Sequence, residues 1–287
     1  MKKKILITGA SGFIGFNTLI ELLDNNNITI ILRKKNSQIT KLRKKHKFNI
    51  IYYKSFNKLN LSLKKINIDY VVHCATHYIK NHSYDDIFNM NSSNLLFGNI
   101  ILENLRSLKV KKFINLTTIW ENYNGTKDNP NNLYSAYKQC FTRIISYYQK
   151  LNPNIAFYNL YLSETFGSND KRVKIIKVLK DNYRKNKKTV INSRNLVVNL
   201  LNVKDVIIAI NKLLNSNIKN GGYLIKNSFN IKISYLINYI NKISNKKMKI
   251  SYQSNKKIVE IFYKYKLLPN FKPKYSKLID ITNFILK

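Results

Sequence analysis

The chain has 287 residues, with 51 lysines and arginines against 14 aspartates and glutamates, and a formal net charge of +37. Its 44% hydrophobic and 12% aromatic content excludes a disordered basic tail. No apolar run approaches the roughly 20 residues of a membrane helix, and the stretch after Lys4 stops at Thr8-Gly9, too early for a signal peptide. We therefore expect a soluble, cytoplasmic globular protein with one large domain, or one domain and a smaller companion.

The positive charge has two interpretations. A strongly basic chain is typical of nucleic-acid-binding proteins. Here, however, lysine is spread from end to end together with Asn, Ile and Tyr, as expected of an AT-rich coding sequence. Its densest cluster, 33–47, is accompanied by no arginine-rich tract, aromatic RNP-type run or zinc-finger spacing. The two cysteines, Cys74 and Cys140, and four histidines have neither a disulfide framework nor metal-ligand spacing, so no metal is expected. We favour composition drift with a preference for small anionic ligands, and keep nucleic acid as the weaker alternative.

The first half of the chain alternates short apolar runs with helical patterns. Apolar runs of this kind, separated by helices, are typical of parallel strands buried on both faces. The predicted strands are 4–8, 28–32, 50–53, 70–75, 113–117 and 155–160. The predicted helices are 13–23, 87–108 and 133–151. Residues 1–167 are therefore predicted to form a Rossmann-type, doubly wound α/β domain with a parallel sheet.

The pattern is looser after Gly167. We expect helices at 173–183, 203–214 and 231–243, a strand at 223–225, and then a polar tail punctuated by Pro269 and Pro273. Residues 168–287 are predicted to form mainly a small C-terminal substrate-binding subdomain, with segments at about 188–227 returning to the core.

A glycine-rich segment directly follows the first strand and opens the first helix. Gly9 permits a tight turn, Gly12 lets the backbone approach a pyrophosphate, and Gly15 allows close packing of helix on strand. This strand–loop–helix setting predicts a dinucleotide site. Its expected contacts are Gly9, Ser11, Gly12, Phe13, Ile14 and Gly15.

The end of the second strand indicates which dinucleotide binds. NAD-preferring sites place an Asp or Glu there for the ribose 2′-hydroxyl, but this strand ends in Leu32-Arg33-Lys34. An arginine accommodates the 2′-phosphate of NADP. We therefore expect NADP(H) in preference to NAD(H), with Arg33 as a cofactor-binding residue.

A tyrosine and a lysine spaced Tyr-x-x-x-Lys lie on one side of a helix, where the cation favours the phenolate and lowers the phenol's pKa. Four such pairs occur, at Tyr123/Lys127, Tyr134/Lys138, Tyr183/Lys187 and Tyr252/Lys256. Only Tyr134 and Lys138 open the long helix after the fifth strand, which ends near Thr118. We expect these three residues to be catalytic, with an exposed helical pair as the alternative.

These motifs together resemble the short-chain dehydrogenase/reductase superfamily in its extended branch, the NAD-dependent epimerase/dehydratase family. The run Asp69–Ala75 resembles the family's fourth strand, so Ala75 is expected to line the cofactor cleft. Within that run, His73 and Cys74 are interpreted as core residues. The resemblance also implies a homodimer formed through the helices around 87–108 and 133–151.

Three segments resemble the CDP-abequose/CDP-paratose synthase group more narrowly: Phe113–Trp120, Asn132–Gln139 and Glu164–Arg172. The resemblance implies NADPH-dependent reduction, at C4, of a nucleotide-linked 4-keto-6-deoxy or 3,6-dideoxy sugar, in deoxysugar biosynthesis for surface polysaccharide. Related dehydratases carry an Asp-Glu pair directly after the active-site Thr. Here Ile119-Trp120 follows Thr118, and neither side chain transfers protons, so dehydration is not expected.

In this hypothesis Tyr134 protonates the nascent alkoxide, Thr118 hydrogen-bonds the same oxygen, and Lys138 binds the nicotinamide ribose. The expected substrate contacts are Thr76, His77 and Tyr78, with Arg172 for the diphosphate, although each could equally be an ordinary surface residue. A 4-epimerase with tightly held NAD uses the same Tyr–Lys pair and remains an alternative. A non-catalytic Rossmann-fold RNA-binding or regulatory protein is the alternative from another class.

Overall fold

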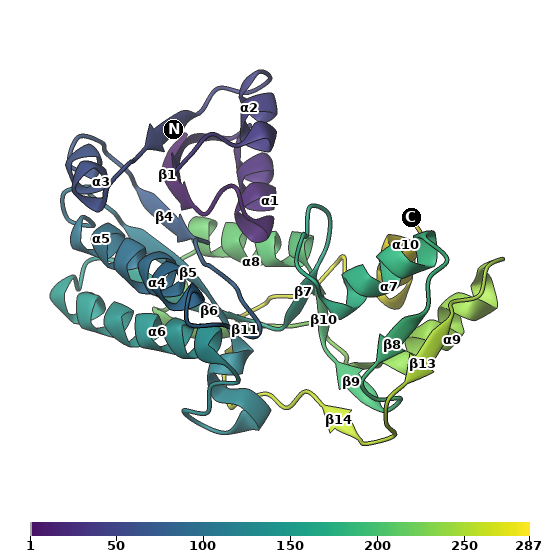
Figure 1. Ribbon diagram of the computed structural model, residues 1–287. Coiled ribbons are helices and arrows are strands. Elements are labelled where there is room, and N and C mark those ends of the chain that lie inside the picture. Colours follow the sequence, from purple (N-terminus) through teal and green to yellow (C-terminus); the bar gives the residue numbers. More distant parts are fainter. Residues whose placement is uncertain (1) are drawn as a thin grey trace.

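The computed structural model describes residues 2–287, which are arranged around one parallel sheet of eight strands (Figure 1). The strand order is β15-β11-β6-β5-β4-β1-β2-β3. The strands are β1 (Lys3–Thr8), β2 (Asn26–Leu32), β3 (Asn49–Tyr52), β4 (Tyr70–His73), β5 (Lys112–Thr118), β6 (Ala156–Leu162), β11 (Gly221–Ile225) and β15 (Lys266–Leu267). The order reverses between β1 and β4, so the predicted Rossmann-type α/β fold is confirmed.

Helices cover both faces of this sheet. One face carries α1 (Phe13–Leu22), α2 (Ser37–Arg43) and α8 (Val203–Asn215). The other carries α3 (Phe56–Leu63), α4 (Asp86–Asn91), α5 (Phe97–Glu103) and α6 (Leu133–Leu151). Neighbouring residues of β1 point to opposite cores: Ile5 and Ile7 pack toward α1, whereas Leu6 packs toward α5. Both faces are buried, and this explains the continuous apolar runs of the strands.

The helix predicted at 87–108 is shorter and less regular than expected. Its middle, Ser92–Leu96, is a π-helical segment between α4 and α5, and the α-helix ends at Glu103. The Asn104 side chain donates to the Ile100 carbonyl oxygen (2.8 Å) and to Asn60 (2.8 Å), and so ends the regular ladder. Leu105 and Leu108 are still fully buried, although they lie in turns and not in the helix. Apolar periodicity therefore extended the prediction beyond the helix.

The C-terminal half contributes to two regions. Helix α8 packs on α1, and β11 pairs with β6 in the main sheet. Apart from the main sheet, small sheets pair β7 (Glu164–Phe166) with β10 (Leu200–Asn202), β8 (Thr189–Ile191) with β13 (Ile250–Tyr252), and β9 (Leu196–Val198) with β12 (Ile231–Lys232) and β14 (Ile258–Val259). Helices α7 (Ile175–Arg184), α9 (Ile233–Ile243) and α10 (Leu278–Leu286) pack around a third apolar core beside them.

The expectation of a polar tail is wrong for the last residues. Helix α10 buries Ile281 and Ile285 in the third core, and its Phe284 ring lies 5.4 Å from that of Phe166. The lysine-rich run before it concealed the amphipathic pattern. None of the helices between residues 2 and 287 is both long and apolar enough to cross a bilayer.

Candidate functional site

A cavity of about 950 Å³ lies where β1, β2, β4, β5 and β6 end, at the carboxyl edge of the sheet. Ligands of open α/β sheets bind at this edge, beside the point where the strand order reverses. The sequence-predicted residues that line the cavity are Gly9, Ser11, Gly12, Phe13, Ile14, Gly15, Arg33, Ala75, Thr76, Tyr78, Thr118, Tyr134, Lys138 and Arg172. The structure thus gathers fourteen of the fifteen predicted site residues around one space. The exception, His77, contacts the buried Asn94 through its backbone instead (2.7 and 3.1 Å).

The glycine loop brings three backbones unusually close together. Gly9 has φ +67°, and a Cβ atom built there would lie 2.6 Å from the Ala75 nitrogen. A Cβ on Gly15 would lie 2.2 Å from the Gly9 carbonyl oxygen, which also accepts a hydrogen bond from the Gly12 N–H (2.9 Å). Side chains would fill this space, and their absence lets α1 start against the strand ends. The free N–H groups of its first turn face the position of a pyrophosphate, so these residues fit a dinucleotide.

A buried hydrogen bond joins β1 to β4 below the loop. The Thr8 hydroxyl accepts from the Ala75 N–H (3.2 Å) and forms a second hydrogen bond with His73 Nδ1 at 3.0 Å. His73 is 1% exposed, and burial lowers its pKa to about 3, which keeps the ring neutral. It stacks with Phe97 and Phe113 in the core. The prediction that His73 is a core residue is confirmed. Its neighbour Cys74 lines the cavity, with the pKa of its thiol raised to about 12 by burial.

A capping box fixes the start of α6. The Asn132 side chain accepts from the Ser135 N–H (2.9 Å), and the Asn132 N–H bonds the Ser135 hydroxyl (3.0 Å). Tyr134 then lies in the first helical turn and Lys138 one turn later, both at the cavity. Thr118 caps the short 3-10 segment after β5 by accepting from the Trp120 N–H (3.2 Å), so its own proton can be donated elsewhere.

The ionisation of Tyr134 differs from the sequence-based expectation. Burial raises the pKa of Tyr134 to about 12, and the positive charge of Arg172 is the influence that opposes this most. Burial also lowers the pKa of Lys138, against the charge of Glu121. Lys138 therefore does not lower the pKa of the Tyr134 phenol toward neutral pH here, because the loss of hydration outweighs the effect of nearby charges. At neutral pH Tyr134 carries its proton, the form that a proton donor needs.

An aromatic and cationic cluster at the cavity was not predicted. Lys174 Nζ lies 4.2 Å from the Trp120 ring centroid and 5.1 Å from that of Tyr78, and it pairs with Glu164 at 2.8 Å. The Tyr78 ring also meets Tyr134 edge-on at 5.0 Å. Trp120 is the chain's one tryptophan and stands two residues after Thr118, which was a usable signal. No sequence signal distinguished Lys174 from the many other lysines of the chain.

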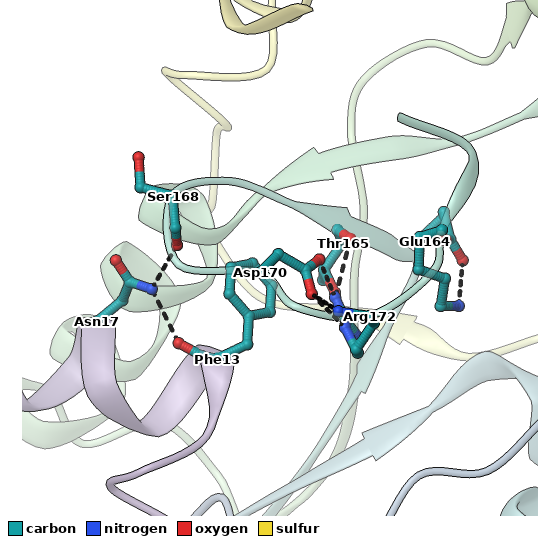
Figure 2. A network of polar contacts seen from close by, with 8 residues as sticks. Phe13, Asn17, Glu164, Thr165, Ser168, Asp170 and Arg172 are labelled. Atoms are coloured by element: carbon teal, nitrogen blue, oxygen red, sulfur yellow. Dashed lines mark hydrogen bonds and ion pairs between the residues drawn. The ribbon is translucent and has the colours of Figure 1, made fainter. Parts of the chain in front are cut away.

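Arg172 forms part of a polar network (Figure 2). Its Nε and Nη2 atoms each donate to Asp170 at 2.8 Å, and Nη2 also reaches the Thr165 carbonyl (3.0 Å) and hydroxyl (2.9 Å). The guanidinium lies 4.7 Å from the Phe13 ring centroid. Nearby, Asn17 Nδ2 donates to the carbonyl oxygens of Phe13 (2.8 Å) and Ser168 (3.0 Å). The network fastens the loop after β7 to α1. Asp170 balances the charge of Arg172, whose expected contact with a diphosphate stays a prediction.

The far end of the cavity is basic. Arg33, Lys34 and Lys35 line it directly after β2, with Asn36 and Gln38 beside them. Among the described residues that line the cavity, the single carboxylate is Glu164, which lies after β6 and is paired with Lys174. The position where a carboxylate would bind a ribose 2′-hydroxyl is therefore occupied by cations.

Comparisons with known proteins agree with this geometry. The model of the NAD dependent epimerase/dehydratase family matches residues 5–231. CDP-abequose synthase of Yersinia pseudotuberculosis is 26% identical over 96% of this chain and 98% of its own, and that of Salmonella muenchen is 25% identical over 88% and 84%. A variant of UDP-glucuronic acid 4-epimerase from Bacillus cereus, solved with UDP-4-deoxy-4-fluoro-glucuronic acid and NAD, superimposes with a TM-score of 0.81. The match covers 100% of this chain and 99% of the epimerase chain. At 21% sequence identity, it shows that the two proteins share a fold.

The Arg172 network gives a stability prediction. Asp170→Asn removes the charge that neutralises Arg172 while keeping the side chain's shape, and we expect the free energy of unfolding to fall by about 2 kcal/mol. Asp24→Asn is the matched control, because the Asp24 side chain is 76% exposed where it pairs with His46. It should change stability by less than about 0.5 kcal/mol. Urea unfolding of both variants checks this, and equal effects would contradict a structural role for the Asp170–Arg172 pair.

Proposed function

Because the chain belongs to the NAD dependent epimerase/dehydratase family, we propose that it is an NADPH-dependent reductase acting at C4 of a nucleotide-linked 4-keto-6-deoxy or 3,6-dideoxy sugar. The coarser description, an NAD(P)-dependent enzyme that modifies nucleotide sugars, follows from the family and from relatives matched over nearly the whole chain. The observation that carries the finer proposal is that Tyr134 and Lys138 share one cavity with the glycine loop and the basic end of β2. The reaction would serve deoxysugar biosynthesis for a surface polysaccharide.

The proposed roles follow from position. The glycine loop and the start of α1 hold the cofactor's pyrophosphate, and Arg33 takes its 2′-phosphate. Bound NADPH supplies the hydride. Tyr134, protonated at neutral pH, donates its proton to the oxygen that becomes the C4 hydroxyl, while Thr118 hydrogen-bonds the same oxygen. Lys138 holds the nicotinamide ribose and stabilises the phenolate left behind.

The sugar and its diphosphate occupy the rest of the cavity. Thr76 and Tyr78 are proposed to contact the sugar, and Arg172 the diphosphate. Trp120 and Lys174 join them, because both line the same wall. Ile119 and Trp120 follow Thr118 and transfer no protons, so the wall favours hydride transfer without loss of water.

The first prediction concerns the phenol. Tyr134→Phe should lower kcat by about 10²-fold or more, because the proton donor is lost, while NADPH still binds. NADPH oxidation against a panel of CDP-, dTDP- and GDP-linked 4-keto sugars measures this. Tyr137→Phe, on the same helix and outside the cavity lining, is the matched control and should retain activity. Wild-type turnover in Tyr134→Phe would contradict the mechanism. Interconversion of C4 epimers without net NADPH oxidation would favour the epimerase.

The second prediction concerns the cofactor. Arg33→Ala should weaken NADPH binding about 10-fold or more and leave NADH nearly unchanged, because a charge-assisted contact to the 2′-phosphate is lost. Fluorescence titration of both nucleotides gives the two Kd values. Arg43→Ala, exposed on α2 and outside the cavity lining, should leave both unchanged. NADH binding at least as tightly as NADPH to the wild-type protein would refute the preference.

We also propose a homodimer through α4–α6. Large apolar side chains are exposed there, including Phe88 (78%) and Tyr147 (59%), and a second copy of this face would bury them. Tyr147→Asp should therefore shift the sedimentation coefficient toward that of the monomer. Tyr235→Asp, 56% exposed on α9, is the control that should not. A wild-type protein that sediments as a monomer would exclude this dimer.

A further inference from the structure

A second, smaller cavity shares one wall with the first. It has a volume of about 210 Å³ and is lined by the segment 164–170, by one face of α7 and by Phe284 of α10. Helices α7 and α10 lie side by side (Figure 1). Glu164, Thr165, Asn169 and Lys174 line both cavities, so β7 and the loop after it form the shared wall. A space of this size holds several water molecules or one small ligand.

The carboxylates that line the second cavity are all paired with other cations. The pairs are Glu164–Lys174 (2.8 Å), Asp170–Arg172 (2.8 Å) and Lys177–Asp181 (2.6 Å). Each negative charge at this cavity is thus already balanced by a positive one. Among residues 2–287, the lining of the cavity has no carboxylate left to neutralise a further cation.

Two more cations of α7 line the cavity. Lys180 and Arg184 lie one helical turn apart, on the face of α7 that also carries Lys177. Within residues 2–287 neither Lys180 nor Arg184 forms an ion pair. Like charges at this spacing repel each other and destabilise a helix. Two positive charges are therefore held together at a cavity that offers nothing to balance them.

The environment of Lys180 adds to this imbalance. Its Nζ atom lies 4.1 Å from the centroid of the Phe284 ring, which covers one side of the ammonium. Burial lowers the pKa of Lys180, and the charge of Arg184 lowers it further, whereas Asp181 opposes them. An anion between Lys180 and Arg184 would replace the lost hydration and offset their repulsion.

We propose that the second cavity is a binding site for a phosphate group, held by the Lys180 ammonium and the Arg184 guanidinium. A phosphate dianion matches the two unbalanced charges, and a guanidinium can donate two parallel hydrogen bonds to it. Inorganic phosphate and a nucleoside monophosphate both carry this group. The site needs neither the dinucleotide nor a sugar, so it does not depend on the proposed function.

Protection of Lys180 from chemical acetylation tests the proposal. The protein is treated with an acetyl N-hydroxysuccinimide ester at increasing inorganic phosphate, while sodium chloride keeps the ionic strength constant, and peptide mass spectrometry gives the rate at each lysine. Phosphate should slow the reaction of Lys180 saturably, by about 10-fold at ten times its Kd. Lys242, exposed at the end of α9, is the internal control and should keep its rate.

Two variants show whether the site is built as proposed. Arg184→Gln removes one of the two charges and should need about 10-fold more phosphate for the same protection of Lys180. Arg43→Gln makes the same change on the exposed surface of α2, outside this cavity, and should leave the protection as in the wild type. Equal protection of Lys180 and Lys242, or an unchanged midpoint in Arg184→Gln, would overturn the proposal.

Amide hydrogen exchange gives a second readout that does not depend on the reactivity of Lys180. Phosphate should slow exchange in peptides that cover 164–184 and leave those of α9 unchanged, because the ligand contacts only the first segment. Exchange that slows equally in both segments would indicate diffuse binding to a basic protein and would contradict a defined site.

Two other anions identify the group that binds. Acetate at the same ionic strength carries a single charge and should protect Lys180 only weakly, so protection equal to that by phosphate would refute the assignment to a phosphate group. Cytidine 5′-monophosphate should protect Lys180 because it carries the same group. A midpoint equal to that of phosphate supports recognition of the phosphate alone. A midpoint lower by about 10-fold or more supports a nucleoside monophosphate as the ligand.

Discussion

The architecture of the site depends on the close approach of three backbone segments at Gly9, Gly15 and Ala75. A Cβ atom at Gly15 would fall 2.2 Å from the Gly9 carbonyl oxygen, and one at Gly9 would fall 2.6 Å from the Ala75 nitrogen. Backbone atoms cannot move aside as a flexible side chain can. The position of α1 on the sheet, and with it the direction of its N-terminal N–H groups, is therefore set by the lack of side chains at two positions.

The close packing at the glycine loop is connected through the sheet to the proposed catalytic residues. The Thr8–His73 hydrogen bond fastens β1 to β4 directly below the glycine loop, and the paired register of β4, β5 and β6 carries that alignment across to Thr118. The capping box at Asn132 then starts α6 so that Tyr134 and Lys138 meet the same cavity. The parallel sheet thus brings together in one site residues that lie more than one hundred positions apart in the sequence, such as Gly9 and Lys138.

The unusual charge of the chain acquires meaning from where its few carboxylates lie. Asp205 is fully buried and accepts hydrogen bonds from the Lys274 and Tyr275 N–H groups, which ties the C-terminal segment to α8. Asp170 pairs with Arg172, and the buried carboxyl of Glu121 lies against the hydroxyls of Thr117 and Thr142. With 14 acidic residues against 51 basic ones, several of the acids are used in the interior, where one charge has a large effect, while many lysines stay at the surface. Much of the net charge of +37 thus lies at the surface, and one part of it, at Arg33, Lys34 and Lys35, lines the cavity.

The sequence by itself determined the sheet, the glycine loop and the Tyr134/Lys138 pair, because each depends on patterns within a few residues: apolar runs, glycine spacing and one helical turn. It also placed His73 in the core. It could not show that Glu121 is buried against Thr117 and Thr142, that Asp170 neutralises Arg172, or that Lys174 lies on Trp120. Nor could it show that burial, more than any neighbouring charge, determines the pKa of the Tyr134 phenol. These depend on which side chains the tertiary structure brings together and removes from water, and desolvation is a property of the packed environment that no local pattern encodes.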